Sequence, residues 1–345
     1  MSQNLRIIDE NSNRLSEGLR VLEDIARMIL NDTGLTQQLK TMRHNLIRAD
    51  LSLNVQLIES RDSVNDIGVD MKVTGEETPK ELPDILVANA RRAQESLRVL
   101  EELAKLPGLN LDSEKYKQAR FNLYTIERNL LSRLLRQDKI QMLTGLYIVI
   151  DTEALKGRDP IKAAQQVIRG GAKTIQFRDK ISSNKELLPV AQKLKDLCSQ
   201  NNVLFIINDH LDLALATDAD GLHVGQDDLP VSIARRELPI DKLIGCSAAS
   251  YDQAIIAVAD GADYLGVGSI FPTSSKGDVD ICGLTVLKQI TQMVKIPVVA
   301  IGGINKNNIA EVVAAGADAI AVISAVLQAA NPEIATRELV GLIEK

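Results

Sequence analysis

The chain of 345 residues is 45% hydrophobic and 25% charged, which is the composition of a globular protein with about two domains. Its net charge of −6, the absence of Trp and an aromatic content of 3% argue against a nucleic-acid-binding surface. Three cysteines far apart in the sequence, a polar N-terminus and the lack of an apolar run of about 18 residues predict a cytoplasmic protein that does not enter a membrane.

Residues 1–138 are predicted to be helical. Leu15, Leu19 and Leu22 are three or four positions apart, which marks one face of a helix. The segment also repeats itself, because residues 11–27 (NSNRLSEGLRVLEDIAR) are similar to residues 89–105 (NARRAQESLRVLEELAK), and residues 43–46 to residues 120–123 at an offset of 77. We therefore expect a duplicated helical hairpin. The polar stretch 62–77, Pro79 and Pro83 would form the loop between the copies.

The repeat includes charged side chains. Arg20 and Glu23 in the first copy recur as Arg98 and Glu101 in the second. Side chains three residues apart lie on neighbouring parts of a helix surface and can form ion pairs. One interpretation is therefore a charged, solvated helix face, and the other is that the pseudo-twofold axis brings arginines together to hold an anion.

The pattern changes near residue 138, so we place a helical domain at 1–138, a linker at 139–145 and a second domain at 146–345. Eight short apolar runs in the second domain are each followed by a helix-like stretch, and they lie at 146–151, 174–179, 204–209, 221–225, 243–248, 264–269, 297–302 and 319–324. Eight strand–helix units predict a (β/α)8 TIM barrel, with a doubly wound open sheet as the alternative. In a barrel the chemistry is expected at the carboxyl ends of the strands.

The second strand ends in QFRDK, residues 176–180. Alternation along a strand directs Gln176, Arg178 and Lys180 to the same side. Two cations beside an amide suit a phosphate or diphosphate, although a solvated strand end would look the same. Asp209 and Asp228 follow the next two strands and would converge on Mg²⁺, unless Asp209 only caps a helix.

The later strand ends predict a second anion site. Ser247 ends the fifth strand, and the loop 270–283 carries hydroxyls and a lysine. Glycine at Gly303 and the strand end before Ser324 suit a phosphate bound by backbone N–H groups. His223 is expected to pack inside an apolar strand, and no nucleophile–base pair is evident. We therefore expect loss of pyrophosphate assisted by cations and Mg²⁺, with a second phosphate site that orients the nucleophile.

Six motifs follow one another in the order of a known family: QFRDK at 176–180, IND at 207–209, GLHVGQDD at 221–228, GVGSIFPTSSK at 266–276, AIGGI at 300–304 and VIS at 322–324. Residues 146–345 thereby resemble thiamine-phosphate synthases. The resemblance implies that hydroxymethylpyrimidine diphosphate and thiazole phosphate give thiamine phosphate and pyrophosphate, with pyrophosphate leaving first. It implies only small-molecule partners and leaves a homo-oligomer open.

The resemblance also implies residue roles. Arg178, Lys180 and Lys276 would be catalytic, and Asp209 and Asp228 would bind Mg²⁺. The pyrimidine diphosphate would be bound by Gln176, Arg178, Lys180, Asn208, Ser247 and Lys276. The thiazole phosphate would be bound by Thr273, Ser275, Gly303, Ile323 and Ser324.

Two alternatives for the barrel are a thiazole tautomerase, which would not need the complete cationic and acidic set, and a non-catalytic sensor of thiamine precursors. Residues 1–138 resemble a helical extension found before the synthase in some bacteria, including cyanobacteria. That resemblance implies a hydroxymethylpyrimidine-phosphate kinase, although the segment has no Gly-rich phosphate-binding loop, and a scaffold is the other hypothesis.

Overall fold

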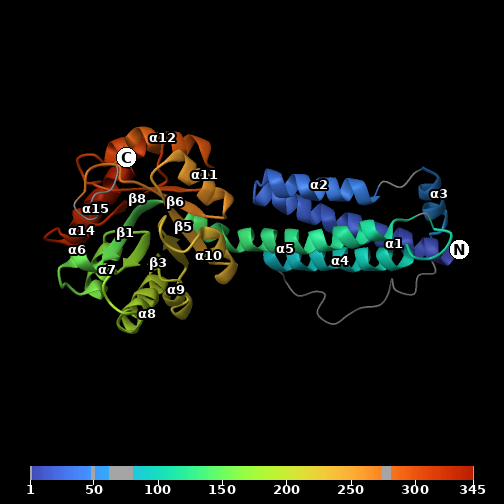
Figure 1. Cartoon of the computed structure of the whole chain (residues 1–345), viewed down its shortest axis with the longest axis horizontal. Helices are drawn as coiled ribbons and strands as arrows, with labels where there is room; N and C mark the ends of the chain where they lie inside the picture. Colours follow the sequence, from blue (N-terminus) through green and yellow to red (C-terminus); the bar gives the residue numbers. More distant parts are fainter. Residues whose placement is uncertain (1, 48–50, 62–80, 110, 274–280, 345) are drawn as a thin grey trace. The chain divides into compact units, whose positions relative to one another are not determined.

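The computed structural model describes residues 2–47, 51–61, 81–109, 111–273 and 281–344 (Figure 1). The chain forms two compact units, Met1–Leu135 and Arg136–Lys345, which are described separately below. The division falls inside one helix, α5 (Ser113–Gln141), so residues 139–141, predicted as linker, are helical. No helix in the described ranges is long and apolar enough to cross a membrane.

The first unit is helical, as predicted. Its elements are α1 (Ser2–Asp24), a π-helical turn η1 (Ile25–Ile29), α2 (Thr33–Ile47), α3 (Leu51–Glu59), α4 (Leu82–Leu103) and the greater part of α5. The predicted loop 62–77 and Pro79 lie outside the described residues. Pro83 does not belong to a loop but to the first turn of α4, where a residue without an N–H group costs no helical hydrogen bond.

The duplicated hairpin is evident in the packing of its two long helices. α1 and α4 contact each other through small and aliphatic side chains, including Leu19, Ala90 and Ala93, all of them buried. A Cβ atom at Gly18 would lie 2.9 Å from the carbonyl oxygen of Asn89, so glycine allows the two helices to approach closely.

The repeated charges form ion pairs. The carboxylates of Glu23 and Glu101, exposed by only 4% and 5%, accept hydrogen bonds from the guanidinium groups of Arg43 (3.0 Å) and Arg120 (2.9 Å). Arg98 also contacts Glu101 at 2.8 Å, three residues along its own helix. The two copies therefore use arginine to neutralise a buried glutamate. The expected ion pairs three residues apart are confirmed, but Glu23 and Glu101 do not lie on a solvated face.

The second unit is a closed barrel of eight parallel strands in sequential order, as predicted, which excludes the open sheet. The strands are β1 (Gly145–Asp151), β2 (Thr174–Arg178), β3 (Leu204–Asn208), β4 (Gly221–Val224), β5 (Leu243–Ala248), β6 (Tyr264–Val267), β7 (Val298–Ile301) and β8 (Ala319–Val322). The helices of this unit are α6 (Thr152–Leu155), α7 (Pro160–Arg169), α8 (Asn184–Gln200), α9 (Leu211–Ala216), α10 (Val231–Glu237), α11 (Tyr251–Ala259), α12 (Gly283–Met293), α13 (Ile309–Ala314), α14 (Ser324–Leu327) and α15 (Pro332–Ile343). Most strand residues are buried, because helices cover the outside and side chains fill the inside.

The last turns of α5 belong to the barrel unit. Arg136 Nε lies 2.9 Å from the carboxylate of Asp263, and both side chains are more than nine-tenths buried. Lys139 Nζ donates to the carbonyl oxygen of Asp241 at 2.8 Å. Asp263 directly precedes β6, so these contacts lie at the amino ends of the strands, opposite to the end where the site is expected.

Candidate active site

Eight of the predicted site residues line a cavity at the carboxyl ends of the strands, whereas Lys180, Asp209 and Asp228 are not part of its lining. The cavity has two parts, which share the walls formed by Ser247, Gly266 and Ile323. The part on the side of the early strands also includes Gln176, Arg178, Asn208 and His223. The part on the side of the late strands also includes Thr273, Gly303 and Ser324. Ser275 and Lys276 lie outside the described residues.

An arginine is fixed at the end of β2. The guanidinium group of Arg178 donates to Oδ2 of Asp151, which pairs with it in the register of β1 and β2. Oδ1 of the buried Asp151 accepts a hydrogen bond from the backbone N–H of Ala154 at 2.8 Å, at the start of α6. Asp151 was not among the predicted site residues, although a carboxylate at the end of the first strand was a visible signal. Asp151 thus orients Arg178 toward the cavity.

A cluster of two carboxylates and a lysine lies beside this arginine. Lys180 Nζ contacts the carboxylate of Asp209 and lies 4.0 Å from that of Asp228. Asn208 also donates to Asp209, at 2.6 Å. Asp209 does not cap α9, whose N-cap is His210, so the alternative interpretation of Asp209 as a helix cap is wrong.

The carboxyl groups of Asp209 and Asp228 share a hydrogen bond. Burial and a hydrogen bond with Asp228 raise the pKa of Asp209 above its usual value. Burial also acts to raise the pKa of Asp228, but the hydrogen bonds from Asp209 and from the N–H of Gly225 outweigh it and lower that pKa. The backbone of Asp209 is in the left-handed region at φ 61°, which is unfavourable for a residue other than glycine. Two carboxylates held in this way form a site disposed to bind a proton or a cation.

A chain of hydrogen bonds crosses the floor of the cavity. Gln176 Nε2 donates to the hydroxyl of Tyr147 at 3.1 Å, and that hydroxyl lies 3.1 Å from the hydroxyl of Tyr264. His223 Nδ1 lies 3.1 Å from Tyr264, and its Nε2 lies 3.0 Å from the hydroxyl of Ser247. Burial raises the pKa of both tyrosines, so they remain neutral hydrogen-bonding groups.

This network corrects the prediction for His223. The ring is buried, as expected inside an apolar strand, but it faces the cavity and connects Tyr264 to Ser247. Tyr147 and Tyr264 were not among the predicted site residues, because their strands are far apart in the chain. They and His223 meet only because the barrel closes and brings β1, β4 and β6 around one interior.

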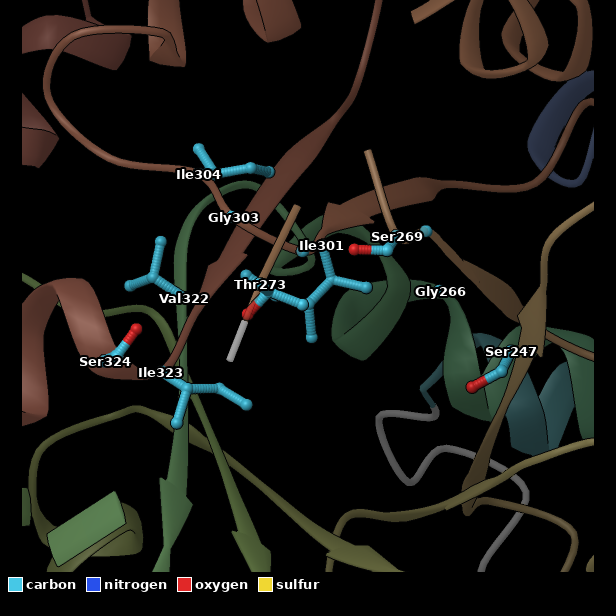
Figure 2. A pocket seen from close by; sticks show the side chains of 13 residues that line it. Ser247, Gly266, Ser269, Thr273, Ile301, Gly303, Ile304, Val322, Ile323 and Ser324 are labelled. Atoms are coloured by element: carbon cyan, nitrogen blue, oxygen red, sulfur yellow. The ribbon is translucent and has the colours of Figure 1, made fainter. Parts of the chain in front are cut away.

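The other part of the cavity is uncharged and is built around the end of β7 (Figure 2). Gly303 has φ 66°, and a Cβ atom there would lie 2.5 Å from the carbonyl oxygen of Pro272. The carbonyl oxygen of Gly303 accepts hydrogen bonds from the side chains of Asn305 and Asn308, which fix this loop. Figure 2 shows the side chains of Thr273, Ile323 and Ser324 around this part, with Ser247 at the other side of the cavity.

Comparisons with known proteins find relatives for both parts of the chain. A family model described as thiamine monophosphate synthase matches residues 146–326, and a model described as the ThiD2 family matches residues 6–129. The thiamine-phosphate synthase of Nostoc punctiforme is 35% identical over 340 residues, which cover 99% of this chain and 94% of that protein. The thiamine-phosphate synthase of a Synechocystis species is 36% identical over 342 residues, with coverages of 99% and 96%.

The barrel also has a relative of known structure. A thiamine phosphate pyrophosphorylase from Pyrococcus furiosus is 40% identical, with a TM-score of 0.55, over 60% of this chain and 98% of that one. The family-model match spans the strands that carry the cavity described above. The chain therefore belongs to the thiamine monophosphate synthase family, whose members are transferases.

Proposed function

We propose that the barrel joins hydroxymethylpyrimidine diphosphate to thiazole phosphate, giving thiamine phosphate and pyrophosphate. The bond between the pyrimidine methylene carbon and the diphosphate oxygen breaks, its electron pair leaves with pyrophosphate, and the thiazole nitrogen forms the new bond to that carbon. The observation that carries the proposal is a cavity with two parts, one with Arg178 in its lining and the other uncharged, which share Ser247 and Ile323. The order of steps follows from the family resemblance.

The cationic part fits the diphosphate. Arg178, held by Asp151, and Lys180 provide positive charge at the end of β2. Fixed cations stabilise charge that develops on a leaving group without reorganisation during the reaction. Gln176, Asn208 and Ser247 line the same region and would bind the pyrimidine and its diphosphate by hydrogen bonds. Lys276 would add a third cation, by the family resemblance alone.

Asp209 and Asp228 fit Mg²⁺. Their oxygens are the ligands that Mg²⁺ prefers. Lys180 is one positive charge beside two carboxylates, so a bound cation would balance the remaining negative charge. Bound Mg²⁺ would neutralise negative charge on the diphosphate. Within the described residues no three His, Cys, Asp or Glu side chains form a metal-binding group, so substrate oxygens and water would complete the coordination.

The neutral part fits the thiazole phosphate. Thr273 and Ser324 supply hydroxyl groups, and the loop of Gly302 and Gly303 allows a phosphate close to the backbone. Ile323 would pack against the thiazole ring, and Ser275 is assigned to the phosphate by resemblance. Holding the phosphate here would orient the thiazole nitrogen toward the pyrimidine methylene carbon.

The test is to mix the full chain with both substrates and Mg²⁺ and to measure thiamine phosphate and pyrophosphate. We expect Arg178→Ala to lower kcat at least about 100-fold, because a cation opposite the leaving group is lost. Arg169→Ala is a matched control, since Arg169 lies on α7 and pairs with Glu333 at the surface. Folded wild-type protein that makes no product, or an unchanged rate in Arg178→Ala, would refute the assignment.

The separate ThiD2 match supports an additional role for the helical unit, and a pyrimidine-phosphate kinase is the candidate. The full chain would be supplied with hydroxymethylpyrimidine phosphate and ATP, with thiazole phosphate omitted. Formation of the diphosphate is the expected result for a kinase. If no diphosphate forms while the synthase reaction proceeds normally, the kinase candidate is eliminated and the barrel assignment is unaffected.

A further inference from the structure

The helical unit has a groove that the synthase reaction does not use. It lies between α2 and α5, has a volume of about 790 Å³, and is formed entirely by residues of the first unit. Its floor is apolar, with Ala119 and Ile126 buried and Met42 and Leu46 half-buried. A groove of this volume can hold a small molecule, with polar side chains around an apolar floor.

The walls of the groove are related by the internal repeat. At the offset of 77, Asn45 corresponds to Asn122, and Thr41 corresponds to Gln118; all four line the groove. The two walls of the groove are therefore built from equivalent positions of the duplicated hairpin. A ligand held here would receive hydrogen bonds from both walls.

Two of these four polar side chains are available to a ligand, since Thr41 accepts from Gln37 and Gln118 donates to Glu114. In the described part of the chain, the side-chain amides of Asn45 and Asn122 have no hydrogen-bond partner. This differs from Asn11 and Asn89, another pair related by the repeat, whose amides donate to the carbonyl oxygens of Ile7 and Ile85 on their own helices. An amide offers a donor and an acceptor side by side, which matches the edge of a nitrogen heterocycle.

The symmetry is broken by charge at one end. The counterpart of Gln38 at the offset of 77 is Lys115, and Lys115 is the sole charged residue among the described residues that line the groove. The neighbouring Lys117 pairs with Glu114, whereas the described residues provide no ion-pair partner for Lys115. An anionic substituent would be favoured at this end and not at the other.

We propose that the groove between α2 and α5 binds a small nitrogen heterocycle that carries one phosphate. Asn45 and Asn122 bind the ring edges, the apolar floor packs against the ring, and Lys115 binds the phosphate. The proposal concerns binding alone and holds whether or not the helical unit transfers phosphate. The choice of probe rests on the proposed function, because the barrel substrates are phosphorylated heterocycles.

Met42 lines the groove and makes the test independent of the barrel. The full chain would be labelled with ¹³C-methyl methionine, and the Met42 signal assigned with Met42→Leu. On titration with hydroxymethylpyrimidine phosphate we expect a saturable shift of the Met42 signal. Met28 and Met293, which are exposed and do not line the groove, serve as internal controls.

Variants distinguish the residues that contact the ring from the residue that contacts the phosphate. Lys115→Gln should weaken binding of the phosphorylated probe about five-fold, as expected for an exposed ion pair, and leave unphosphorylated hydroxymethylpyrimidine unaffected. Asn45→Ala and Asn122→Ala should each weaken both probes about five-fold. Lys117→Gln, on the same helix outside the groove, should bind like wild type.

Three results would overturn the proposal. One is an unchanged Met42 signal at millimolar hydroxymethylpyrimidine phosphate and thiazole phosphate. Another is an equal shift with inorganic phosphate, which would mean an unspecific anion contact. The third is a Met42 signal that depends on protein concentration without any probe, which would mean that a second copy of the chain covers the groove. Synthase activity measured in parallel keeps these results distinct from a failure of the barrel assignment.

Discussion

Asp209 combines an unfavourable backbone conformation with a carboxylate whose ionised form is disfavoured. Its φ of 61° lies in the left-handed region, and its partly buried carboxylate lies against that of Asp228. Such conformations cost about 1–3 kcal/mol and persist where the surrounding structure imposes them, often at functional sites. The hydrogen bond from its N–H to the carbonyl oxygen of His223 (2.8 Å) provides that constraint here. Asp209 thus combines two features that lower the stability of the fold.

Asp209→Asn should therefore stabilise the barrel while it impairs the reaction. The folded-state pKa of Asp209 is raised above the unfolded value, so the ionised carboxylate is disfavoured in the folded protein. This cost is present above the folded-state pKa and disappears as the pH falls through it. We expect Asn to raise the Tm of the barrel by about 2 °C at neutral pH, and this advantage should shrink on acidification.

Thermal unfolding at several pH values checks this expectation, with synthase assays in parallel. Asp227→Asn is the matched control, because Asp227 is exposed and its side chain has no hydrogen bond or ion pair among the described residues. A lower Tm for Asp209→Asn at neutral pH would contradict the argument, since it would mean that the contact with Lys180 outweighs the repulsion by Asp228.

Gly303 should be essential for the neutral part of the cavity. Alanine there would face both a positive φ and a Cβ atom 2.5 Å from the carbonyl oxygen of Pro272, so the loop must move. We expect Gly303→Ala to raise KM for thiazole phosphate about ten-fold or more, with a small change in KM for the diphosphate. Steady-state kinetics with each substrate varied will measure this. Gly341→Ala is the control, because it has open space around it; equal effects of Gly303→Ala on both substrates would contradict the division of the cavity.

Single residues were predictable where the pattern is local. Alternation along one strand suffices to place Gln176 and Arg178 on the same wall of the cavity. Asp151 was missed because its role depends on the strand register that sets it opposite Arg178. The interior network was missed for the same reason, since Tyr147 and Tyr264 meet only across the closed barrel. Long-range partners are not encoded in local periodicity.

Among the elements, strands were easier to predict than the helix that joins the units. Strands buried on both sides appear as continuous apolar runs bounded by Gly or Asp, so their ends are visible in the sequence. The end of α5 was predicted too early because its last turns are rich in polar and charged residues. Those charges are satisfied by the barrel, where Arg136 pairs with Asp263 and Lys139 contacts Asp241.

Removing the arginine of this buried pair should destabilise the barrel. Asp263 also accepts from Arg235 and from the N–H of Ile244, so Arg136→Ala leaves a buried carboxylate with fewer partners. Loss of one partner of a buried ion pair costs about 3 kcal/mol or more. We expect the unfolding transition of the barrel to shift to lower temperature. Calorimetry of the full chain measures it.

Arg133→Ala provides the comparison on the same helix. Arg133 pairs with Asp32 but is largely exposed, so its removal should cost less than about 1 kcal/mol. Equal losses of stability from the two substitutions would show that burial of the Arg136–Asp263 pair does not determine its contribution to stability.

At the scale of the whole molecule, the two compact units divide at Leu135 and Arg136, within the continuous helix α5. The relative from Pyrococcus furiosus is matched over 98% of its length by 60% of this chain, so in that protein the barrel is nearly the whole chain. A barrel fragment of this protein should therefore be able to fold. The first residue of the fragment determines its stability, because Arg136 and Lys139, which contact the barrel, precede β1 in the chain.

We expect residues 130–345 to fold with the barrel Tm and the synthase kcat/KM of the full chain. A fragment of residues 145–345 keeps every strand but loses Arg136 and Lys139, so the carboxylate of Asp263 keeps Arg235 as its one arginine partner among the described residues. Its Tm should be lower by several degrees, as expected for a loss of about 3 kcal/mol in a domain of this size. Its KM values should stay unchanged, because the lost contacts lie at the end of the barrel opposite the cavity. If both fragments melt at the same temperature, the last turns of α5 do not stabilise the barrel. If the shorter fragment loses activity but keeps its Tm, the contacts at the amino ends of the strands affect the reaction, which contradicts the argument that stability and activity depend on opposite ends of the barrel.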